Sequence, residues 1–257
     1  MRSGVPGITE LRQKCQPSTV VGRRSEEHWT GRLYMRRLSI HVTRLAIRLG
    51  TPADAVTALM LLVGVAGAGM LFVGGLWPTV ALVLGIQLYG LLDAVDGEVA
   101  RWNETTSPRG IYLDRVSHYL VEGTIFAGLG WRAGGGELGS VWFPLGLIAA
   151  LGVVFRRAET DLVDAARAKS GMTAVGDRGA AIRVRPLRLL RRAADFVPIH
   201  RATGAVEASL LILAAAVGDA IRSDLVASRG LLAGLTALVW LVAFGHLVAV
   251  LASERLR

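Results

Sequence analysis

Long apolar stretches dominate this chain and restrict it to a bundle of membrane-spanning helices. A helix that crosses a membrane needs about 20 mostly apolar residues. The chain is 52% hydrophobic with a mean hydropathy of +0.46, which is more apolar than a typical soluble domain. This total apolar length disfavours the alternative, core helices of a soluble protein. We therefore expect an all-α, polytopic membrane protein with six spans, over Ala55–Trp77, Pro78–Leu92, Ile111–Trp131, Leu138–Phe155, Thr203–Ile221 and Leu231–Leu251.

The distribution of lysine and arginine predicts how these spans are oriented. With six spans, 25 of the 29 basic residues fall on one side of the membrane and three on the other. Cytoplasmic loops are rich in Lys and Arg, so we expect both termini in the cytoplasm. Trp77, Trp131 and Trp142 then lie near the outer surface, as an aromatic belt would. The same bias accounts for the net charge of +9 without a nucleic-acid partner.

The chain before the first span divides into two parts. Residues 1–28 are expected to be irregular, and residues 29–50 are expected to form an amphipathic juxtamembrane helix. Such a helix can lie on an anionic leaflet with its arginines facing the headgroups. A surface helix packed on the bundle is an equally good interpretation, and the two do not exclude each other. The apolar residues that recur at helical spacing are Met35, Leu38, Val42, Leu45, Ala46 and Leu49.

Charged residues interrupt the second and third spans in a regular pattern. Asp93, Asp96, Gly97 and Ala100 are spaced to share one face of a helix, and Gly110, Asp114 and His118 are spaced to share one face of the next. The loop that joins the two helices is short, which favours antiparallel neighbours. The two polar faces are therefore expected to meet just inside the cytoplasmic surface.

Three carboxylates that converge in such a place predict a bound cation. Charged groups are costly within a membrane helix and usually mark function. Carboxylates held close together in a low dielectric either take up protons or share a cation. Oxygen ligands favour Mg²⁺, Mn²⁺ or Ca²⁺, and Mg²⁺ often bridges carboxylates and substrate phosphates. Gly97 and Ala100 on the same face leave room for a bulky ligand, so the spacing predicts a metal-and-phosphate site.

The same residues resemble the signature of the CDP-alcohol phosphotransferase family. That signature reads D-x-x-D-G-x-x-A-R, eight residues, then G-x-x-x-D-x-x-x-D. This chain matches seven of its eight positions with the same spacing, from Asp93 to Asp114, and has His118 where the family has its last aspartate. The segment TPADAVT, residues 51–57, loosely resembles the family's Thr-Pro-Asn-x-x-Thr segment, with one extra residue and no Asn.

The resemblance implies a fold, an activity and a set of site residues. Members transfer a substituted phosphate from a CDP-linked donor to an alcohol and release CMP. It implies a six-helix catalytic domain over residues 51–257, usually as a homodimer, in what we expect to be a bacterial plasma membrane. By this resemblance Asp93, Asp96 and Asp114 ligate a pair of Mg²⁺ or Mn²⁺ ions, Gly97 and Ala100 make room for the nucleotide, Arg101 pairs with a carboxylate or a phosphate, and Thr51, Pro52 and Thr57 border the cytidine.

His118 is the departure from the family pattern. In the family this position is the expected general base and also lies at the second metal. Histidine can serve as either, because its ordinary pKa near 6.5 suits proton removal at neutral pH and its imidazole ligates metals. Losing a negative charge is expected to weaken the second metal or shift its preference towards Mn²⁺. An inactive, degenerate site is the alternative, and the intact remainder of the signature favours activity.

Other polar residues allow more than one interpretation. Glu122 either orients His118 through a hydrogen bond or forms an unrelated interhelical bond. His246 is expected to hydrogen-bond between helices, and Glu207 and Asp219 are expected to be interfacial rather than catalytic. A set of basic residues either binds a phosphorylated acceptor or supplies ordinary cytoplasmic charge near lipid headgroups: Arg156, Arg157, Arg167, Lys169 and Arg178.

The sequence leaves the substrates and two rival functions open. CDP-diacylglycerol with a small polar acceptor is the first expectation, and transfer of a CDP-linked head group to a lipid or glycan is the second. A transporter would place its carboxylates near the bilayer midplane and interrupt helices in both halves. A non-catalytic scaffold would bind CDP compounds without releasing CMP. Metal-dependent binding of a cytidine nucleotide separates the transporter from the other two.

Overall fold

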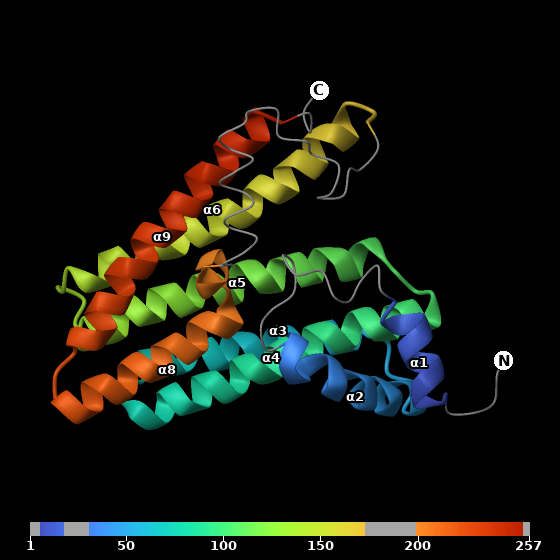
Figure 1. Cartoon of the computed structure of the whole chain (residues 1–257), viewed down its shortest axis with the longest axis horizontal. Helices are drawn as coiled ribbons and strands as arrows, with labels where there is room; N and C mark the ends of the chain where they lie inside the picture. Colours follow the sequence, from blue (N-terminus) through green and yellow to red (C-terminus); the bar gives the residue numbers. More distant parts are fainter. Residues whose placement is uncertain (1–5, 18–30, 173–198, 254–257) are drawn as a thin grey trace.

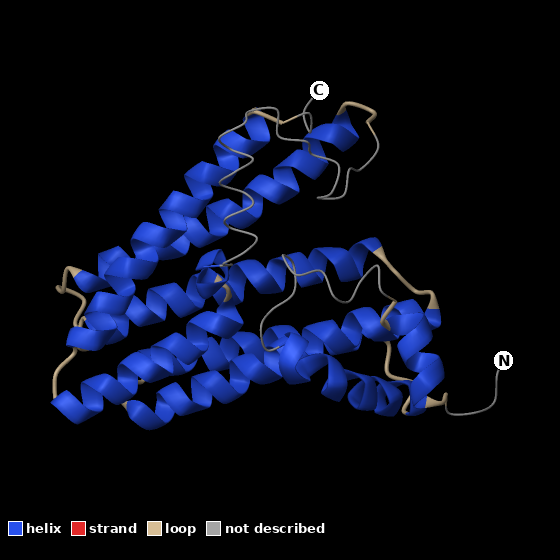
Figure 2. Ribbon diagram, viewed as in Figure 1, coloured by secondary structure: helices blue, strands red, loops and turns tan. Residues whose placement is uncertain are grey.

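Helices make up the whole secondary structure of the part of the chain that the structure describes. The computed structural model describes residues 6–17, 31–172 and 199–253, and this part contains helices joined by turns, without strands (Figures 1 and 2). The prediction of an all-α fold is thereby confirmed. The helices are α1 (Ile8–Cys15), η1 (Gly31–Met35), α2 (Arg36–Arg48), α3 (Ala53–Gly69), η2 (Met70–Phe72), α4 (Leu76–Asn103), α5 (Pro108–Ala133), α6 (Trp142–Lys169), η4 (Ile199–Thr203), α8 (Ala205–Arg222) and α9 (Val226–Leu251).

A long helix occupies each of the six stretches expected to span the membrane. Three of them are long and apolar enough to cross a membrane by length and composition: α3 continued by η2, α4, and α9. The other three, α5, α6 and α8, carry charged side chains that lie between helices. The six-span plan thus has six matching helices, and hydropathy alone supports three of them.

Two of these helices run well beyond the apolar stretches that predicted them. The second expected span ended at Leu92, but α4 continues through the acidic motif to Asn103. The fourth ended at Phe155, but α6 continues to Lys169. Hydropathy falls at both places because the side chains become charged, whereas the backbone remains helical. This extension carries the motif residues of α4 on a continuous helix.

Close helix contacts hold the bundle together. The backbones of α5 and α6 touch at Gly130 and Gly146, where a Cβ atom on Gly130 would lie 2.7 Å from the Gly146 Cα. Small residues at such crossings let helices approach closely, as is common in membrane bundles. α6 and α9 lie side by side and extend together away from α5, in the upper part of Figure 1.

The first described helix corrects the expectation that residues 1–28 are irregular. Ile8–Cys15 form α1, and this helix packs against α2 and α4. Leu11 and Cys15 are fully buried with Ile40 of α2, which stabilises a helix too short to form alone. The remaining residues of that segment lie outside the described part of the chain. Burial raises the pKa of the Cys15 thiol to about 11.

The juxtamembrane helix α2 packs on the bundle, as one of the two interpretations of its sequence predicts. One face, with Ser39, Ile40, Thr43 and Ala46, is buried against the rest of the protein. The residues of the expected apolar stripe are therefore of two kinds. Met35 and Ala46 are buried, whereas the leucines of a neighbouring sector are at least half exposed. That exposed sector consists of Leu38, Leu45 and Leu49.

Two acidic residues of α8, expected to be interfacial rather than catalytic, are buried near the ends of that helix. Glu207 and Asp219 are 1% and 3% exposed. Asp219 accepts hydrogen bonds from the backbone N–H groups of Ala227 and Ser228 at 2.9 and 3.2 Å, and so caps the first turn of α9. It also lies 3.6 Å from the guanidinium of Arg132 at the end of α5. This network joins three helix ends.

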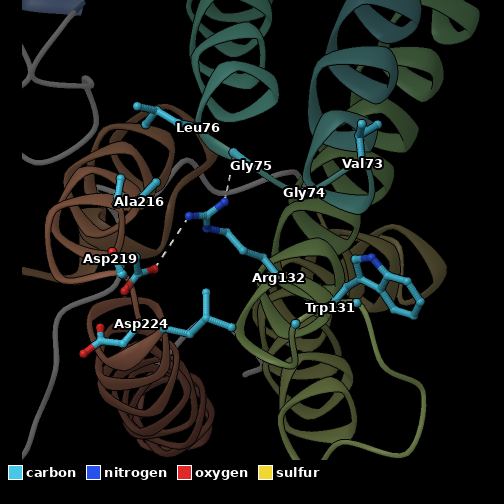
Figure 3. A pocket seen from close by; sticks show the side chains of 14 residues that line it. Val73, Gly74, Gly75, Leu76, Trp131, Arg132, Ala216, Asp219 and Asp224 are labelled. Atoms are coloured by element: carbon cyan, nitrogen blue, oxygen red, sulfur yellow. Dashed lines mark hydrogen bonds and ion pairs between the residues drawn. The ribbon is translucent and has the colours of Figure 1, made fainter.

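The network borders a cavity of about 370 Å³ at one end of the bundle (Figure 3). Arg132 points into this region, but its nitrogens are already engaged. It donates to the Gly75 carbonyl at 2.9 Å, to the Ser228 hydroxyl at 3.2 Å and to the Thr79 hydroxyl at 3.3 Å. These contacts give the arginine a structural role, the joining of α4, α5 and α9.

Candidate active site

A short loop brings the two polar helix faces together at the other end of the bundle. α4 ends at Asn103, and Glu104 follows it in the left-handed conformation with φ of 56°. Ser107 then caps α5, because its side-chain oxygen accepts from the Gly110 N–H at 2.9 Å, and Pro108 occupies the first helical position. The chain therefore reverses within a few residues, and α5 returns beside α4.

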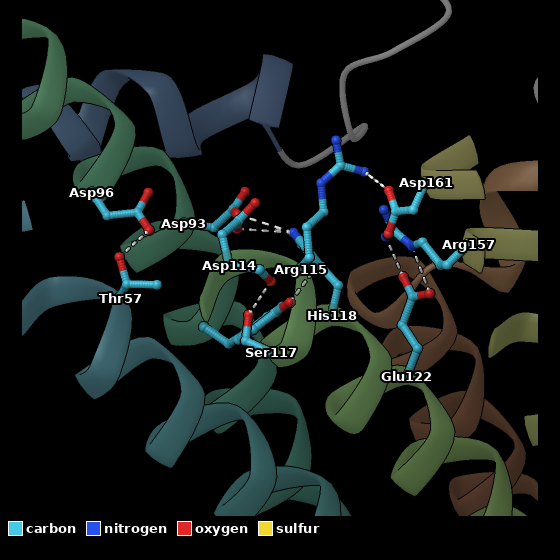
Figure 4. A network of polar contacts seen from close by, with 11 residues as sticks. Thr57, Asp93, Asp96, Asp114, Arg115, Ser117, His118, Glu122, Arg157 and Asp161 are labelled. Atoms are coloured by element: carbon cyan, nitrogen blue, oxygen red, sulfur yellow. Dashed lines mark hydrogen bonds and ion pairs between the residues drawn. The ribbon is translucent and has the colours of Figure 1, made fainter. Parts of the chain in front are cut away.

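Asp93, Asp114 and His118 form the centre of the candidate site (Figure 4). One ligand atom of each lies within 4.8 Å of those of the other two. The His118 Nε2 atom is 3.3 Å from Asp93 Oδ1 and 3.4 Å from Asp114 Oδ1. All three side chains are partly buried, so the group combines two carboxylates and an imidazole with limited access to water.

Asp96 lies beside this group and turns towards α3. Its carboxylate accepts a hydrogen bond from the Thr57 hydroxyl at 2.9 Å, and its residue is 9% exposed. Asp96 borders the same cavity as Asp93 and Asp114, which has a volume of about 290 Å³. The structure thus places all three signature aspartates around one cavity, with Thr57 fixing the most buried of them.

The remaining residues expected at the site are divided between the cavity and its surroundings. Gly97, Ala100 and Arg101 of α4 line it, together with Thr57. Gly97 provides space that the Arg101 guanidinium uses, since a Cβ atom there would lie 3.1 Å from Arg101 Nη1. Thr51 and Pro52 precede α3, and neither is among the described residues that line the cavity.

Arg101 has a partner that the sequence did not indicate. Its Nε–H donates to the backbone carbonyl of Cys15 at 2.8 Å. The expected partners were a carboxylate or a phosphate, whereas this contact ties the arginine to the end of α1. Nearby, Glu98 is fully buried and receives hydrogen bonds from Gln16, Ser39 and Thr43 at 2.6–2.8 Å. Helices α1 and α2 are thus fastened to α4 next to the cavity.

Tyr89 is a neighbour of the site that sequence reasoning missed. Its hydroxyl lies 2.6 Å from His118 Nδ1, and its ring is 2% exposed. Tyr89 precedes Asp93 by four residues, so both occupy the same face of α4. That spacing is the signal that could have revealed it. The contact occupies Nδ1, so His118 has one ring nitrogen, Nε2, directed towards the two carboxylates.

Glu122 bonds to α6 and not to His118. Two nitrogens of Arg157 contact its carboxylate at 3.0 and 2.5 Å, and Arg156 lies 3.8 Å away. The interhelical interpretation of Glu122 is therefore the one that the structure supports. The Glu122 carboxylate thereby engages Arg157 and Arg156, two of the basic residues considered for acceptor binding. Among the others, Arg167 is buried on α6, and Arg178 lies outside the described residues.

Further polar contacts connect the site helix α5 with its neighbours. Asp161 of α6 pairs with Arg115 and accepts from the Tyr119 hydroxyl at 2.8 Å. His246 of α9 contacts Glu159 of α6 at 2.9 Å, which confirms that it bonds between helices. These pairs anchor α6 to the helices on both of its sides.

The cluster lies in the C-terminal half of α4 and the N-terminal half of α5, whereas Trp77 and Trp131 lie at the other ends of these two helices. Asp93 follows Trp77 by 16 residues, or about 24 Å of helix, and Asp114 precedes Trp131 by about 26 Å. These separations are most of the roughly 30 Å thickness of a membrane's hydrocarbon core.

The family model for CDP-alcohol phosphatidyltransferase matches residues 50–252. A phosphatidylinositol phosphate synthase from Streptomyces avermitilis is 34% identical over 109 residues, which are 41% of this chain and 43% of that protein. A bifunctional IPC transferase and DIPP synthase from Thermococcus kodakarensis is 33% identical over 129 residues, 49% of this chain and 27% of that protein. The chain thus spans less than half the length of these curated relatives.

Solved structures show the same fold. The phosphatidylinositol phosphate synthase of Mycobacterium tuberculosis with CDP-DAG bound superimposes with a TM-score of 0.54 at 23% identity, covering 85% of this chain and 96% of that one. The same enzyme in complex with manganese and citrate gives a TM-score of 0.53 at 23% identity, covering 84% and 90%. The match of the family model to most of the chain, with the signature residues gathered at one cavity, shows that this protein belongs to the CDP-alcohol phosphatidyltransferase family.

Proposed function

We propose that this chain is an integral membrane CDP-alcohol phosphotransferase that moves a substituted phosphate from a CDP-linked donor to an alcohol and releases CMP. The observation that carries this proposal is the arrangement of Asp93, Asp96 and Asp114 around one cavity, with His118 in contact with two of them. The family supplies the reaction class, and the relatives' names favour CDP-diacylglycerol as donor and a small polar alcohol as acceptor.

The donor set fits a divalent metal. Two carboxylates and an imidazole nitrogen lie within 4.8 Å of one another, and Asp96 adds a third carboxylate at the same cavity. Such groups match Mg²⁺ or Mn²⁺, and the nitrogen favours Mn²⁺ over Mg²⁺. We propose that Asp93, Asp96, Asp114 and His118 hold one or two such ions. When bound, the metal offsets the charge of the donor diphosphate and of departing CMP.

The chain's own residues then bind and orient the two substrates. Gly97 and Ala100 line the α4 side of the cavity, where the nucleotide is proposed to bind beside the Arg101 guanidinium, and Thr57 donates a hydrogen bond to Asp96. Arg101 is held by the Cys15 carbonyl and lines the same cavity, with its terminal nitrogens beside Gly97, where we propose that they contact the donor phosphates. Thr51 and Pro52, at the start of α3, are proposed to border the cytidine.

His118 is proposed as the general base. The Nε2 atom takes the proton of the acceptor hydroxyl as the acceptor oxygen bonds to the transferred phosphorus. The bond between that phosphorus and the CMP oxygen breaks, and CMP leaves with the bonding electrons. Only Nε2 faces the carboxylates, so one nitrogen serves either as base or as metal ligand at a given moment.

The setting of the enzyme follows from the charge bias and the family. We propose that residues 51–257 form the catalytic domain, that both termini and the cavity face the cytoplasm of a bacterium, and that the enzyme is a homodimer. The excess of basic residues on one side of the spans supports the orientation. A transporter would place its charges near the midplane, whereas this group lies towards one end of the bundle.

A donor and acceptor panel tests the proposal. Purified protein in lipid nanodiscs is incubated with CDP-diacylglycerol or other CDP-linked donors, with several alcohols and with Mg²⁺ or Mn²⁺, and CMP release is measured. We expect metal-dependent release with at least one pair, abolished by Asp96→Asn. The matched control is Asp224→Asn, at the far end of the bundle, which should retain the wild-type rate. Binding of CDP compounds without CMP release would instead favour the scaffold, and undiminished release by Asp96→Asn would contradict the proposed site.

A further inference from the structure

Tyr89 occupies an unusual place beside the residue that distinguishes this chain from its family. His118 stands where the family signature has aspartate, and its Nδ1 atom contacts the hydroxyl of Tyr89. The Tyr89 hydroxyl lies 2.6 Å from that atom, while Nε2 lies 3.3 and 3.4 Å from the two carboxylates. The ring is therefore held between a phenol on one side and the acidic cluster on the other.

The surroundings of Tyr89 fix its ring as well as its hydroxyl. The two rings meet edge to face, with centroids 5.8 Å apart and an interplanar angle of 88°. Gly64 of α3 provides the space for Tyr89, because a Cβ atom at Gly64 would lie 2.6 Å from the Tyr89 Cδ2 atom and 2.6 Å from the Val121 Cγ2 atom. Tyr89 is thus packed closely among α3, α4 and α5, with its hydroxyl oxygen at His118.

We propose that Tyr89 is a positioning residue that sets the orientation of His118, and this inference rests on the proposed function. A histidine that works through one ring nitrogen usually has the other nitrogen fixed by a hydrogen bond. Here the contact between Nδ1 and the Tyr89 hydroxyl holds the ring so that Nε2 faces Asp93 and Asp114. The same orientation serves His118 as base or as metal ligand, since both uses require Nε2 at the acidic cluster.

The competing explanation is that Tyr89 only fills the core. A buried tyrosine needs a partner for its hydroxyl in any case. If that were its whole role, loss of the hydroxyl would have the same effect whichever residue stands at position 118. If Tyr89 acts through His118, its hydroxyl matters only while the histidine is present. The two explanations therefore differ in a double-mutant cycle.

The cycle combines Tyr89→Phe with His118→Ala, which removes the ring that Tyr89 contacts. In the wild-type background, Tyr89→Phe should lower kcat about 10-fold and leave KM for the donor nearly unchanged, as loss of a residue that orients a functional histidine does. In the His118→Ala background, Tyr89→Phe should change the residual kcat less than about twofold. Gly64→Ala, which displaces the Tyr89 ring, should follow the same pattern. Equal losses in both backgrounds, or no loss in the wild type, would overturn the inference.

A spectroscopic measurement gives a readout independent of turnover. In Mg²⁺-loaded protein with ¹⁵N-labelled histidine, the His118 signals are assigned by their disappearance in His118→Asp. We expect the His118 Nδ1 signal to shift in Tyr89→Phe, because the hydrogen bond at that atom is lost. Identical His118 signals in wild type and Tyr89→Phe would overturn the inference. The Asp96→Asn variant separates the positioning role of Tyr89 from the proposed function, because full activity of this variant would contradict the proposed function itself.

Discussion

The Glu122–Arg157 pair gives the sharpest stability prediction. Glu122 is 1% exposed and receives two hydrogen bonds from Arg157, across the interface of α5 and α6. Arg157→Met leaves that carboxylate buried with only Arg156, at 3.8 Å. Removing one partner of a buried ion pair costs about 3–5 kcal/mol, and the second arginine places the expected loss near the lower end, at about 3 kcal/mol.

The assay for this prediction is thermal unfolding of purified protein in detergent. In a chain of this size, about 3 kcal/mol corresponds to a decrease in Tm of about 6–12 °C. The double variant Glu122→Leu with Arg157→Met removes both charges and should recover most of the loss, because no charge is left unpaired. The control is Arg222→Met, which breaks an exposed pair with Asp224 and should shift Tm little. A double variant as unstable as Arg157→Met would refute the reasoning.

Three further predictions concern the site and its surroundings. His118→Ala should release CMP at least about 100-fold more slowly than wild type, within the usual range for a lost general base, whereas His118→Asp should retain partial activity; an unchanged rate for His118→Ala would exclude the base assignment. Treatment with EDTA should abolish CMP release, and Mn²⁺ or Mg²⁺ should restore it; activity that survives chelation would contradict a metal-dependent reaction. Burial excludes reagents from the Cys15 thiol and raises its pKa to about 11, so the thiol is protonated at pH 7.5. A maleimide should therefore label it at this pH only after unfolding, and rapid labelling of the folded protein would contradict the packing of α1.

The sequence was sufficient to predict the helical class and the approximate place of each long helix. Apolar runs identified these helices because a membrane requires them, but the same signal fails where a helix leaves the apolar region. For this reason the apolar runs stop at Leu92 and Phe155, whereas α4 continues to Asn103, as the helical spacing of its acidic motif predicts, and α6 continues to Lys169. α1 was missed because eight residues without an apolar run form a helix only through packing, here around Leu11 and Cys15.

The site could be predicted in part for a related reason. Asp93, Asp96 and Asp114 could be expected to meet because helical spacing and a short loop fix their relative positions. Contacts between helices that depend on register could not be derived in this way. Three such contacts are those of Tyr89 with His118, Glu122 with Arg157 and Arg101 with Cys15.

The most direct test of the central claim is an anomalous diffraction measurement on crystals grown with Mn²⁺ and a CDP-linked donor. The account predicts manganese peaks among Asp93, Asp96, Asp114 and His118, adjacent to the donor diphosphate in the 290 Å³ cavity. Manganese bound elsewhere, or a donor diphosphate bound away from these carboxylates, would contradict it.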